Sequence, residues 1–185
     1  DLHSFPTRRS SDLSVTVNSS GGTATAGTDY APIVSQIVTF PAAASSITVT
    51  VPVTNDIDVE ADETFSLTLS NPVSATISTG SAVGTIEDDD TATVFFNFNG
   101  NVTGAEGSTL NFPVTVNNAI SGGFNLAYTV VAQTASSSDF SVTSGTLTFA
   151  GNTGEIQTIT VDATDDSIVE AAETFLVSIG SASGT

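Results

Sequence analysis

The sequence contains no cysteine, methionine or tryptophan, and Arg8 and Arg9 are its only arginine or lysine side chains. The absence of cysteine excludes a disulfide scaffold, thiol catalysis and a cysteine-ligated zinc site, and it is compatible with either the cytosol or a bacterial exterior. No apolar run approaches the roughly 18 residues that a membrane-spanning helix requires. We therefore do not expect this stretch of chain to cross a bilayer.

The charge of the chain is almost entirely negative. Twenty acidic residues face two basic ones, which gives a formal net charge of −18 at pH 7. From residue 14 onward there is no lysine or arginine, so these carboxylates have no counter-cation among the side chains. A surface of this sign repels phosphate groups, which makes nucleic acids and anionic membranes poor partners, and we expect cations to balance it.

Residues 1–13 differ in composition from the rest of the chain. They hold the only histidine and both arginines, and at Ser14 the composition changes to serine, threonine and valine. We interpret these residues as a tail foreign to the protein. The alternative is a natural basic arm or a targeting segment, although the apolar stretch of a signal peptide is missing.

Short segments of alternating apolar and polar residues predict β-strands throughout the remaining sequence. They are roughly 4 to 8 residues long and are bounded by glycine, proline, asparagine or serine. Short strands at about ten-residue spacing are typical of an antiparallel Greek-key sandwich, so we predict an all-β fold. The expected strands are residues 14–18, 33–40, 46–53, 65–69 and 83–86, and then 93–99, 109–116, 124–131, 145–149, 158–163 and 174–179.

An acidic segment that leads into an alternating strand occurs twice, 110 residues apart. The repeated positions are Asp56, Glu60, Glu63 and Phe65 in the first copy and Asp166, Glu170, Glu173 and Phe175 in the second. This spacing predicts two domains, residues 14–90 and 91–185. We expect each to lack one end, because the first has no counterpart of residues 93–116 and the second has none of the V-G-T-I-E-D-D-D segment at residues 83–90.

Carboxylates gathered at one end of a sandwich repel one another and favour a bound cation. Two like charges about 4 Å apart cost roughly 4 kcal/mol at an effective dielectric constant of about 20. Calcium accepts many oxygen ligands in flexible geometry, whereas magnesium demands a tighter octahedron and zinc prefers histidine or cysteine. The segment is not an EF-hand, because Ala61 stands where that loop needs glycine and Leu67 where it needs glutamate.

Four motifs of the first copy are specific in combination. They are G-T-A-T-A-G-T-D-Y at residues 22–30, I-T-V-T-V-P-V at 47–53, N-D-I-D-V-E-A-D-E-T-F at 55–65 and V-G-T-I-E-D-D-D at 83–90. Together they resemble the Calx-beta domain family, which occurs in sodium/calcium exchangers, integrin β4 and bacterial surface proteins. The resemblance covers residues 14–185 as two tandem copies, and it implies immunoglobulin-like β-sandwiches with calcium bound by loops at one end.

The resemblance also implies calcium ligands by position. They are Asp29, Asp56, Glu60, Glu63, Asp88, Asp89 and Asp90 in the first copy, and Glu106, Asp139, Asp165, Asp166, Glu170 and Glu173 in the second. Asn55 departs from the aspartate that the family usually has, and neither copy holds a complete ligand set. Four further acids, Asp58, Asp62, Glu155 and Asp162, are interpreted as solvated, and a polar linker is the alternative for residues 88–90.

The resulting hypothesis is a non-enzymatic calcium-binding repeat module, a structural or adhesive segment of a larger secreted or surface-anchored bacterial protein. Calcium is expected to stiffen the junction between the domains, and neighbouring repeats and cell-surface or matrix ligands are the candidate partners. One alternative is a calcium-sensing regulatory domain on the cytosolic face of a membrane transporter, a role in cell communication. A hydrolase with paired carboxylates is disfavoured, because no histidine, lysine or arginine follows residue 13.

Overall fold

The computed structural model describes residues 13–41, 44–141 and 144–184. Every regular element in these ranges is a β-strand, β1 to β10 in chain order, which confirms the all-β class. No helix that is long and apolar enough to cross a membrane occurs among these residues. The tail expected at residues 1–13 lies, apart from Leu13, outside the described residues.

Contacts within the chain divide it into two compact units. Unit 1 comprises Asp1–Asp56 and Ala61–Asp88, and unit 2 comprises Ile57–Glu60 and Asp89–Thr185. The domain boundary after residue 90 stays a prediction.

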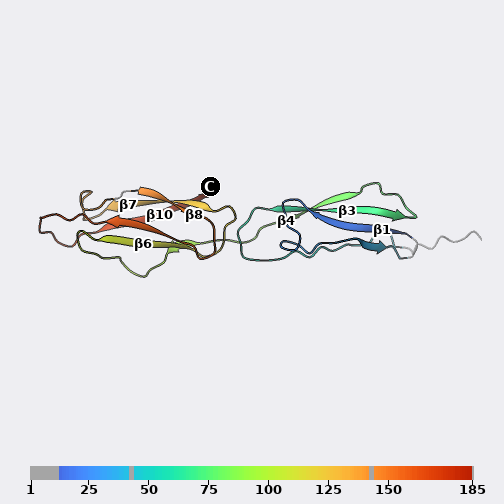
Figure 1. Cartoon of the computed structure of the whole chain (residues 1–185), viewed down its shortest axis with the longest axis horizontal. Coiled ribbons are helices and arrows are strands. Elements are labelled where there is room, and N and C mark those ends of the chain that lie inside the picture. The colour runs from blue at the N-terminus through green and yellow to red at the C-terminus, as the bar shows by residue number, and fades with distance from the viewer. Residues whose placement is uncertain (1–12, 42–43, 142–143, 185) are drawn as a thin grey trace, which may run out of the picture. The chain divides into compact units, whose positions relative to one another are not determined.

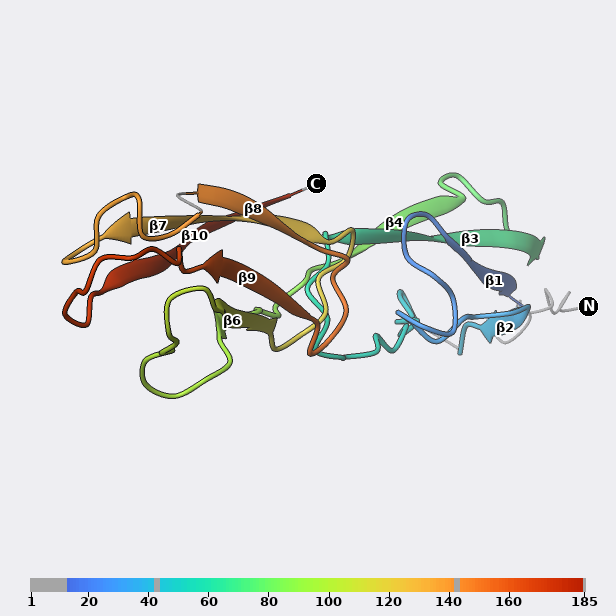
Figure 2. The same ribbon diagram turned by 60° about the vertical axis from the view of Figure 1, so that its left-hand side comes forward.

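Unit 2 is a sandwich of two antiparallel sheets. One sheet has the strand order β5-β6-β9 and the other has the order β10-β7-β8, and Figure 2 shows them as two layers. Each strand overlaps a segment that the sequence predicts as a strand. The bounds are Val94–Phe96 for β5, Thr109–Val116 for β6, Phe124–Ala132 for β7, Ser144–Phe149 for β8, Ile156–Asp162 for β9 and Phe175–Gly184 for β10.

The core of unit 2 forms because alternate residues of both sheets point inward. On β6, Phe112 and Val114 are 8% and 0% exposed. On the opposite sheet, the rings of Phe124 and Phe149 stack with their centroids 4.6 Å apart. Phe112 also meets Phe175 of that sheet at 6.0 Å. Burying each such side chain contributes about 1.5–3 kcal/mol, so the inward residues fix the register of the strands.

Unit 1 has a single sheet in its described part, with the order β2-β1-β3-β4 (Figure 1). The ring of Phe65 in β3 stacks on Tyr30 with centroids 4.8 Å apart. The pair recurs in unit 2 as Phe175 and Phe140, at 5.1 Å, so the repeat extends from the sequence to the packing. The bounds are Ser14–Gly21 for β1, Gln36–Thr39 for β2, Glu63–Val73 for β3 and Ser81–Ile86 for β4.

The strand expected at residues 46–53 does not form, and that prediction is wrong. Within this segment only Val53 makes a bridge, to Tyr30. The equivalent residues of unit 2 form β9, whose partner strand is β6. The described part of unit 1 has no counterpart of β6, so residues 46–53 have no ladder to join. Ile47 and Val49 still pack against the buried cluster that includes Val17.

Replacing Tyr30 with phenylalanine should stabilise unit 1. The Tyr30 hydroxyl is fully buried and has no hydrogen-bond partner among the residues that the structure describes. A buried hydroxyl without a partner costs about 1–3 kcal/mol, and unit 2 has Phe140 at the equivalent position. Tyr30→Phe should therefore raise the free energy of unfolding by about 1 kcal/mol in a urea titration.

Tyr128→Phe is the matched control for this change. Tyr128 is only half-buried, so its hydroxyl reaches water and its removal should bring no gain. A loss of stability in Tyr30→Phe would mean that the Tyr30 hydroxyl does have a partner in solution.

Candidate metal centres

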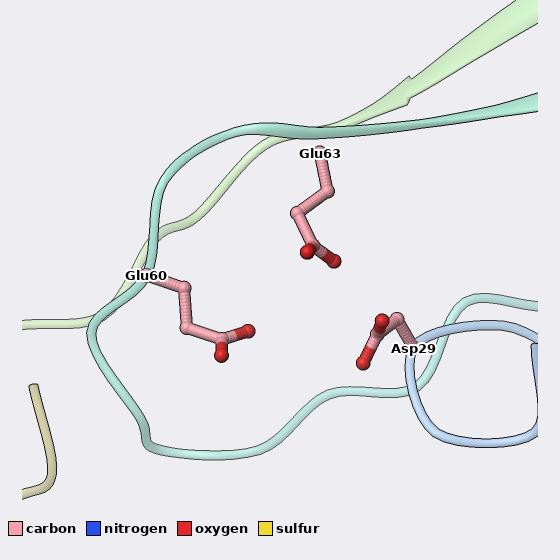
Figure 3. Close-up of side chains that lie close together, drawn as sticks. All are labelled: Asp29, Glu60 and Glu63. Atoms are coloured by element: carbon pink, nitrogen blue, oxygen red, sulfur yellow. The ribbon is translucent and has the colours of Figure 1, made fainter. Parts of the chain in front are cut away.

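Two groups of carboxylates come together in the structure, and each contains three residues. In the first trio, Asp29, Glu60 and Glu63 place one oxygen each within 4.8 Å of the others. Figure 3 shows the three side chains pointing toward one another, with Glu60 and Glu63 on one segment and Asp29 on another. The second trio has the same geometry at positions 110 residues later, and its members are Asp139, Glu170 and Glu173.

Backbone hydrogen bonds place the aspartate of each trio. The Thr54 amide donates to the Asp29 carbonyl at 2.9 Å, and the Thr164 amide donates to the Asp139 carbonyl at 2.8 Å. The Asp139 carboxylate also accepts a hydrogen bond from the Ser136 amide at 2.6 Å. The loop is therefore tied at the same residue in both copies, and the carboxylate has little freedom to leave the trio.

The last glutamate of each trio is placed by the start of a strand. Glu63 is the first residue of β3, and the next amide, that of Thr64, donates to the Thr23 hydroxyl at 2.9 Å. In unit 2 the Thr174 amide, next to Glu173, donates to the Thr134 hydroxyl at 2.8 Å. The repeated hydrogen bond to a threonine hydroxyl fixes the backbone position of the glutamate at the start of its strand.

Hydrogen bonds, desolvation and neighbouring charges shift the pKa values of the carboxylates in the second trio. The pKa of Glu173 is raised, first by its hydrogen bond to Asp139, and then by desolvation and the charges of Asp139, Glu170 and Glu106. Desolvation is the main cause of the raised pKa of Glu170, followed by the charges of Asp139, Asp166 and Glu106. The pKa of Asp139 is lowered, chiefly by the Ser136 amide. Protons therefore bind Glu173 more readily than Asp139.

A family model described as the Calx-beta domain matches residues 6–90 and again residues 87–185. The chain belongs to the Calx-beta family. The comparison with curated proteins gave no match. Among solved structures, the chain is similar to CBD12 from CALX1.2, with 23% identity over 95% of this chain and 70% of that one, at a TM-score of 0.41. It is also similar to the calcium binding domain CBD12 of CALX1.1, with 22% identity over 95% and 69%, at a TM-score of 0.41.

The remaining ligands that the Calx-beta resemblance implies lie outside the two trios. Glu106 and Asp166 are close enough to raise the pKa of Glu170 by their charge. Asp165 lies beside Gly107, where an added Cβ would be 3.3 Å from the Cβ of Asp165. The other residues that the structure does not bring into a trio are Asp56, Asp88, Asp89 and Asp90. All of these ligand assignments stay predictions.

Three Calx-beta acids that the sequence pattern assigns to solvent have defined contacts, and one of them, Asp162, accepts a hydrogen bond from the Thr109 hydroxyl at 2.6 Å. The carboxylate of Glu155 accepts hydrogen bonds from the Ala150, Gly151 and Asn152 amides at 3.0 to 3.2 Å. Desolvation is the largest single effect on the pKa of Glu155, and it raises the pKa. The three amide hydrogen bonds and one from Gln157 together lower the pKa by more than this, so the net shift is downward. Asp62 accepts a bond from the Asp88 amide at 3.2 Å. The glycine-containing turn at residues 150–155, which closes on its own acid, is the sequence signal for the Glu155 contacts.

The donor set of each Calx-beta trio fits calcium better than magnesium or zinc. Three carboxylates supply several hard oxygen ligands, and the flexible geometry of calcium tolerates their placement on loops. Neither trio contains the histidine or cysteine that zinc prefers. Lysine and arginine are absent from residue 14 onward, so no basic side chain there competes for the carboxylates.

Glu173→Gln should change the pH dependence of stability in calcium-free buffer. Glutamine imitates the protonated glutamate and can still donate to Asp139. The pKa values of Glu173 and Glu170 are raised above the ordinary value of a glutamate, which is about 4.5. The stability from their protonation is therefore present below that pH and is lost as the pH rises through the raised pKa values. We expect Glu173→Gln and the unsubstituted chain to melt alike near pH 4, and Glu173→Gln to melt higher at pH 7.

The measurement is the melting temperature in EDTA by calorimetry, and Glu87→Gln is the control. Glu87 is exposed and lies outside both trios, so its neutralisation should give no comparable divergence between the two pH values. A Glu173→Gln difference that is the same at every pH would contradict the raised pKa.

Proposed function

We propose that this chain is a pair of calcium-binding Calx-beta repeats with no catalytic role. The observation that carries the proposal is the second trio, which repeats the geometry of the first at the same spacing. A chance cluster of surface acids would not recur at equivalent positions with equivalent threonine contacts. Calx-beta domains are regulatory or structural β-sandwich domains, which agrees with a binding role.

The energetics of each trio favour cation binding. Three carboxylates within 4.8 Å of one another repel when no cation lies between them. A divalent ion reverses the sign of these interactions, and the hydrogen bonds at Asp29 and Asp139 keep two of the loops in place for it. The charges of Glu106 and Asp166 contribute to the raised pKa of Glu170. We therefore assign both residues to the outer part of the second site.

Calcium should bind to both trios and stabilise the fold. A ligand of the native state that is present at 100 times its Kd stabilises by about 2.7 kcal/mol, so calcium should raise the melting temperature. Glu60→Gln with Glu63→Gln should remove the first site, and Glu170→Gln with Glu173→Gln should remove the second. Isothermal titration calorimetry on the whole chain should show one class of sites lost in each variant.

Asp58→Asn with Glu87→Gln is the matched control, because it removes the same number of charges from acids outside the trios. It should keep both classes of sites. If all three variants lost calcium binding equally, general charge would account for the binding. If the unsubstituted chain gave no heat and no thermal shift at millimolar calcium, the calcium proposal would have to be withdrawn.

The same titration addresses the biological setting. We favour a structural or adhesive segment of a larger secreted or cell-surface protein, in keeping with a chain rich in serine, threonine and glycine and free of lysine. Extracellular calcium modules bind at about 10⁻⁴ to 10⁻³ M, whereas cytosolic sensors bind at about 10⁻⁷ to 10⁻⁵ M. A micromolar or tighter Kd would favour the second candidate, a calcium-sensing regulatory domain of a membrane transporter.

Calcium should also restrict motion between the two domains. Asp88, Asp89 and Asp90 are the last residues of the first copy, and the Asp88 amide donates to Asp62 in the acidic segment of the same copy. If these three carboxylates bound a calcium ion, fewer residues between the two domains would be free to move. NMR relaxation should give separate tumbling times for the domains in EDTA and one common time in calcium.

Neutralising the linker tests this part of the proposal by itself. A chain with Asp88→Asn, Asp89→Asn and Asp90→Asn should still bind calcium at the trios but should keep separate tumbling times. Equal tumbling of this variant and the unsubstituted chain in calcium would exclude the linker from the effect.

A further inference from the structure

Asn99 is the only asparagine in the sequence that is followed by glycine. Asn99 and Gly100 lie in the bend at residues 97–100, at the start of the connection from β5 to β6. Asparagine is among the chemically labile residues, because its side-chain amide can react with the backbone nitrogen of the next residue. Glycine in the next position hinders this reaction least, since it has no side chain. Whether the pair reacts depends on how firmly the fold holds both groups.

The fold holds neither of these two groups. Asn99 and Gly100 are both exposed, and within the described residues neither the Asn99 side chain nor the Gly100 amide makes a hydrogen bond. Gly100 has a φ of 86°. Apart from its chain neighbours, no described atom lies within 4 Å of the place that a Cβ on Gly100 would occupy. A glycine with this much space can change its backbone angles at little cost, so its nitrogen can approach the Asn99 side chain.

The other asparagines lack this combination. Six of them have side chains that are held by hydrogen bonds, namely Asn18, Asn55, Asn71, Asn117, Asn118 and Asn125. The remaining four precede a phenylalanine, valine or threonine, whose side chain crowds the nitrogen that would have to attack, and these are Asn97, Asn101, Asn111 and Asn152. Asn99 alone joins a side chain without hydrogen bonds in the described structure to a following glycine.

We propose that Asn99 is a site of spontaneous deamidation, a modification that requires water but no enzyme. The Gly100 nitrogen gives up its proton and attacks the Cγ atom of Asn99, and the Cγ–Nδ2 bond breaks. Ammonia leaves with that proton, and a five-membered succinimide ring remains. Water then opens the ring at one of its two carbonyl carbons. The reaction involves no metal, so the proposal does not rest on the proposed calcium function.

The two ways of opening the ring give two products. If water adds to Cγ, the bond from Cγ to the Gly100 nitrogen breaks, and residue 99 becomes an ordinary aspartate. If water adds to the backbone carbonyl carbon, the original peptide bond breaks and the chain continues through Cγ, which gives an isoaspartate with an additional carbon atom in the main chain. Either product adds one negative charge to the net charge of −18, which becomes −19.

The isoaspartate product would alter the end of β5. Its additional main-chain atom directly follows Phe98, whose ring centroid lies 5.5 Å from that of Phe96 and 6.0 Å from that of Phe112. Phe96 and Phe98 pack against the buried core of unit 2. The isoaspartate form should therefore melt at a lower temperature than the unmodified chain, whereas the aspartate form keeps the backbone and should melt close to it.

The reaction is followed on the whole chain during incubation in mildly alkaline buffer, because the attacking nitrogen must lose its proton. Anion-exchange chromatography should separate a growing fraction that binds more tightly, since that fraction carries one more negative charge. Cleavage after Glu87 and Glu106 followed by mass spectrometry should place the change at Asn99. An unchanged mass after weeks of incubation, or a change at another asparagine in place of Asn99, would overturn the proposal.

Asn101 is the matched control within the same molecule. It is exposed like Asn99, but it precedes Val102, which packs against the core of unit 2, so it should stay unmodified. Asn99→Gln is the control variant, because the ring that glutamine would form is six-membered and closes far more slowly. This substitution leaves Gly100 and its positive φ in place, whereas Gly100→Ala would strain the backbone. Equal appearance of the tightly bound fraction in Asn99→Gln would contradict the assignment.

The rate of the reaction tests the structural argument by itself. Because the fold holds neither group, the folded chain should deamidate within a few-fold of the rate of the chain unfolded in urea. A folded chain that reacted a hundred times more slowly would show that the fold protects the pair, and the proposal would be wrong for the native protein. Asp-N protease, which cuts before aspartate but not before isoaspartate, gives the ratio of the two products.

Discussion

A backbone hydrogen bond to the carbonyl of Asp29, and its copy at Asp139, is the interaction on which both candidate metal centres depend. The donors are Thr54 and Thr164, which lie 25 residues after the aspartates in sequence. Each bond therefore ties the aspartate loop to another part of the chain. Carboxylates that repel one another stay together only if the backbone beneath them is held. The cost of gathering the charges is thus offset by ordinary hydrogen bonds and by the aromatic pair below, Tyr30 with Phe65 and Phe140 with Phe175.

Much of this arrangement could be predicted from the sequence, because it depends on local pattern and on repetition. Glu60 and Glu63 have the same spacing as Glu170 and Glu173, which predicts that each pair occupies the same position in its copy. The structure places one pair in each trio. The absence of a strand at residues 46–53 could not be predicted from the local pattern. A strand requires a hydrogen-bonded partner strand, and that partner is distant in sequence. The contacts of Glu155 were missed for a similar reason: an acid in a turn is indistinguishable from a solvated one until the turn closes around it.

The two copies also show how strand partners govern burial. Phe65 and Phe175 occupy equivalent positions, and each contacts the aromatic ring 35 residues before it, but within the described residues only Phe65 belongs to a strand that is paired on both sides. The difference comes from a neighbouring strand and not from the residue itself. Sequence similarity between repeats therefore does not imply equal exposure.

The glycine of β4 has a further consequence for folding. Gly84 of β4 lies opposite Phe65 of β3, and a Cβ at this position would lie 2.6 Å from the Cζ atom of Phe65. Strand β10 repeats the sequence pattern of β3, and tandem repeats of similar sequence are prone to exchange strands during refolding. The correct pairing has the advantage of proximity: β3 and β4 are separated by a short connection, so closing that loop costs less entropy than reaching β10. Chain connectivity, more than side-chain chemistry, then decides which edge the segment finds first.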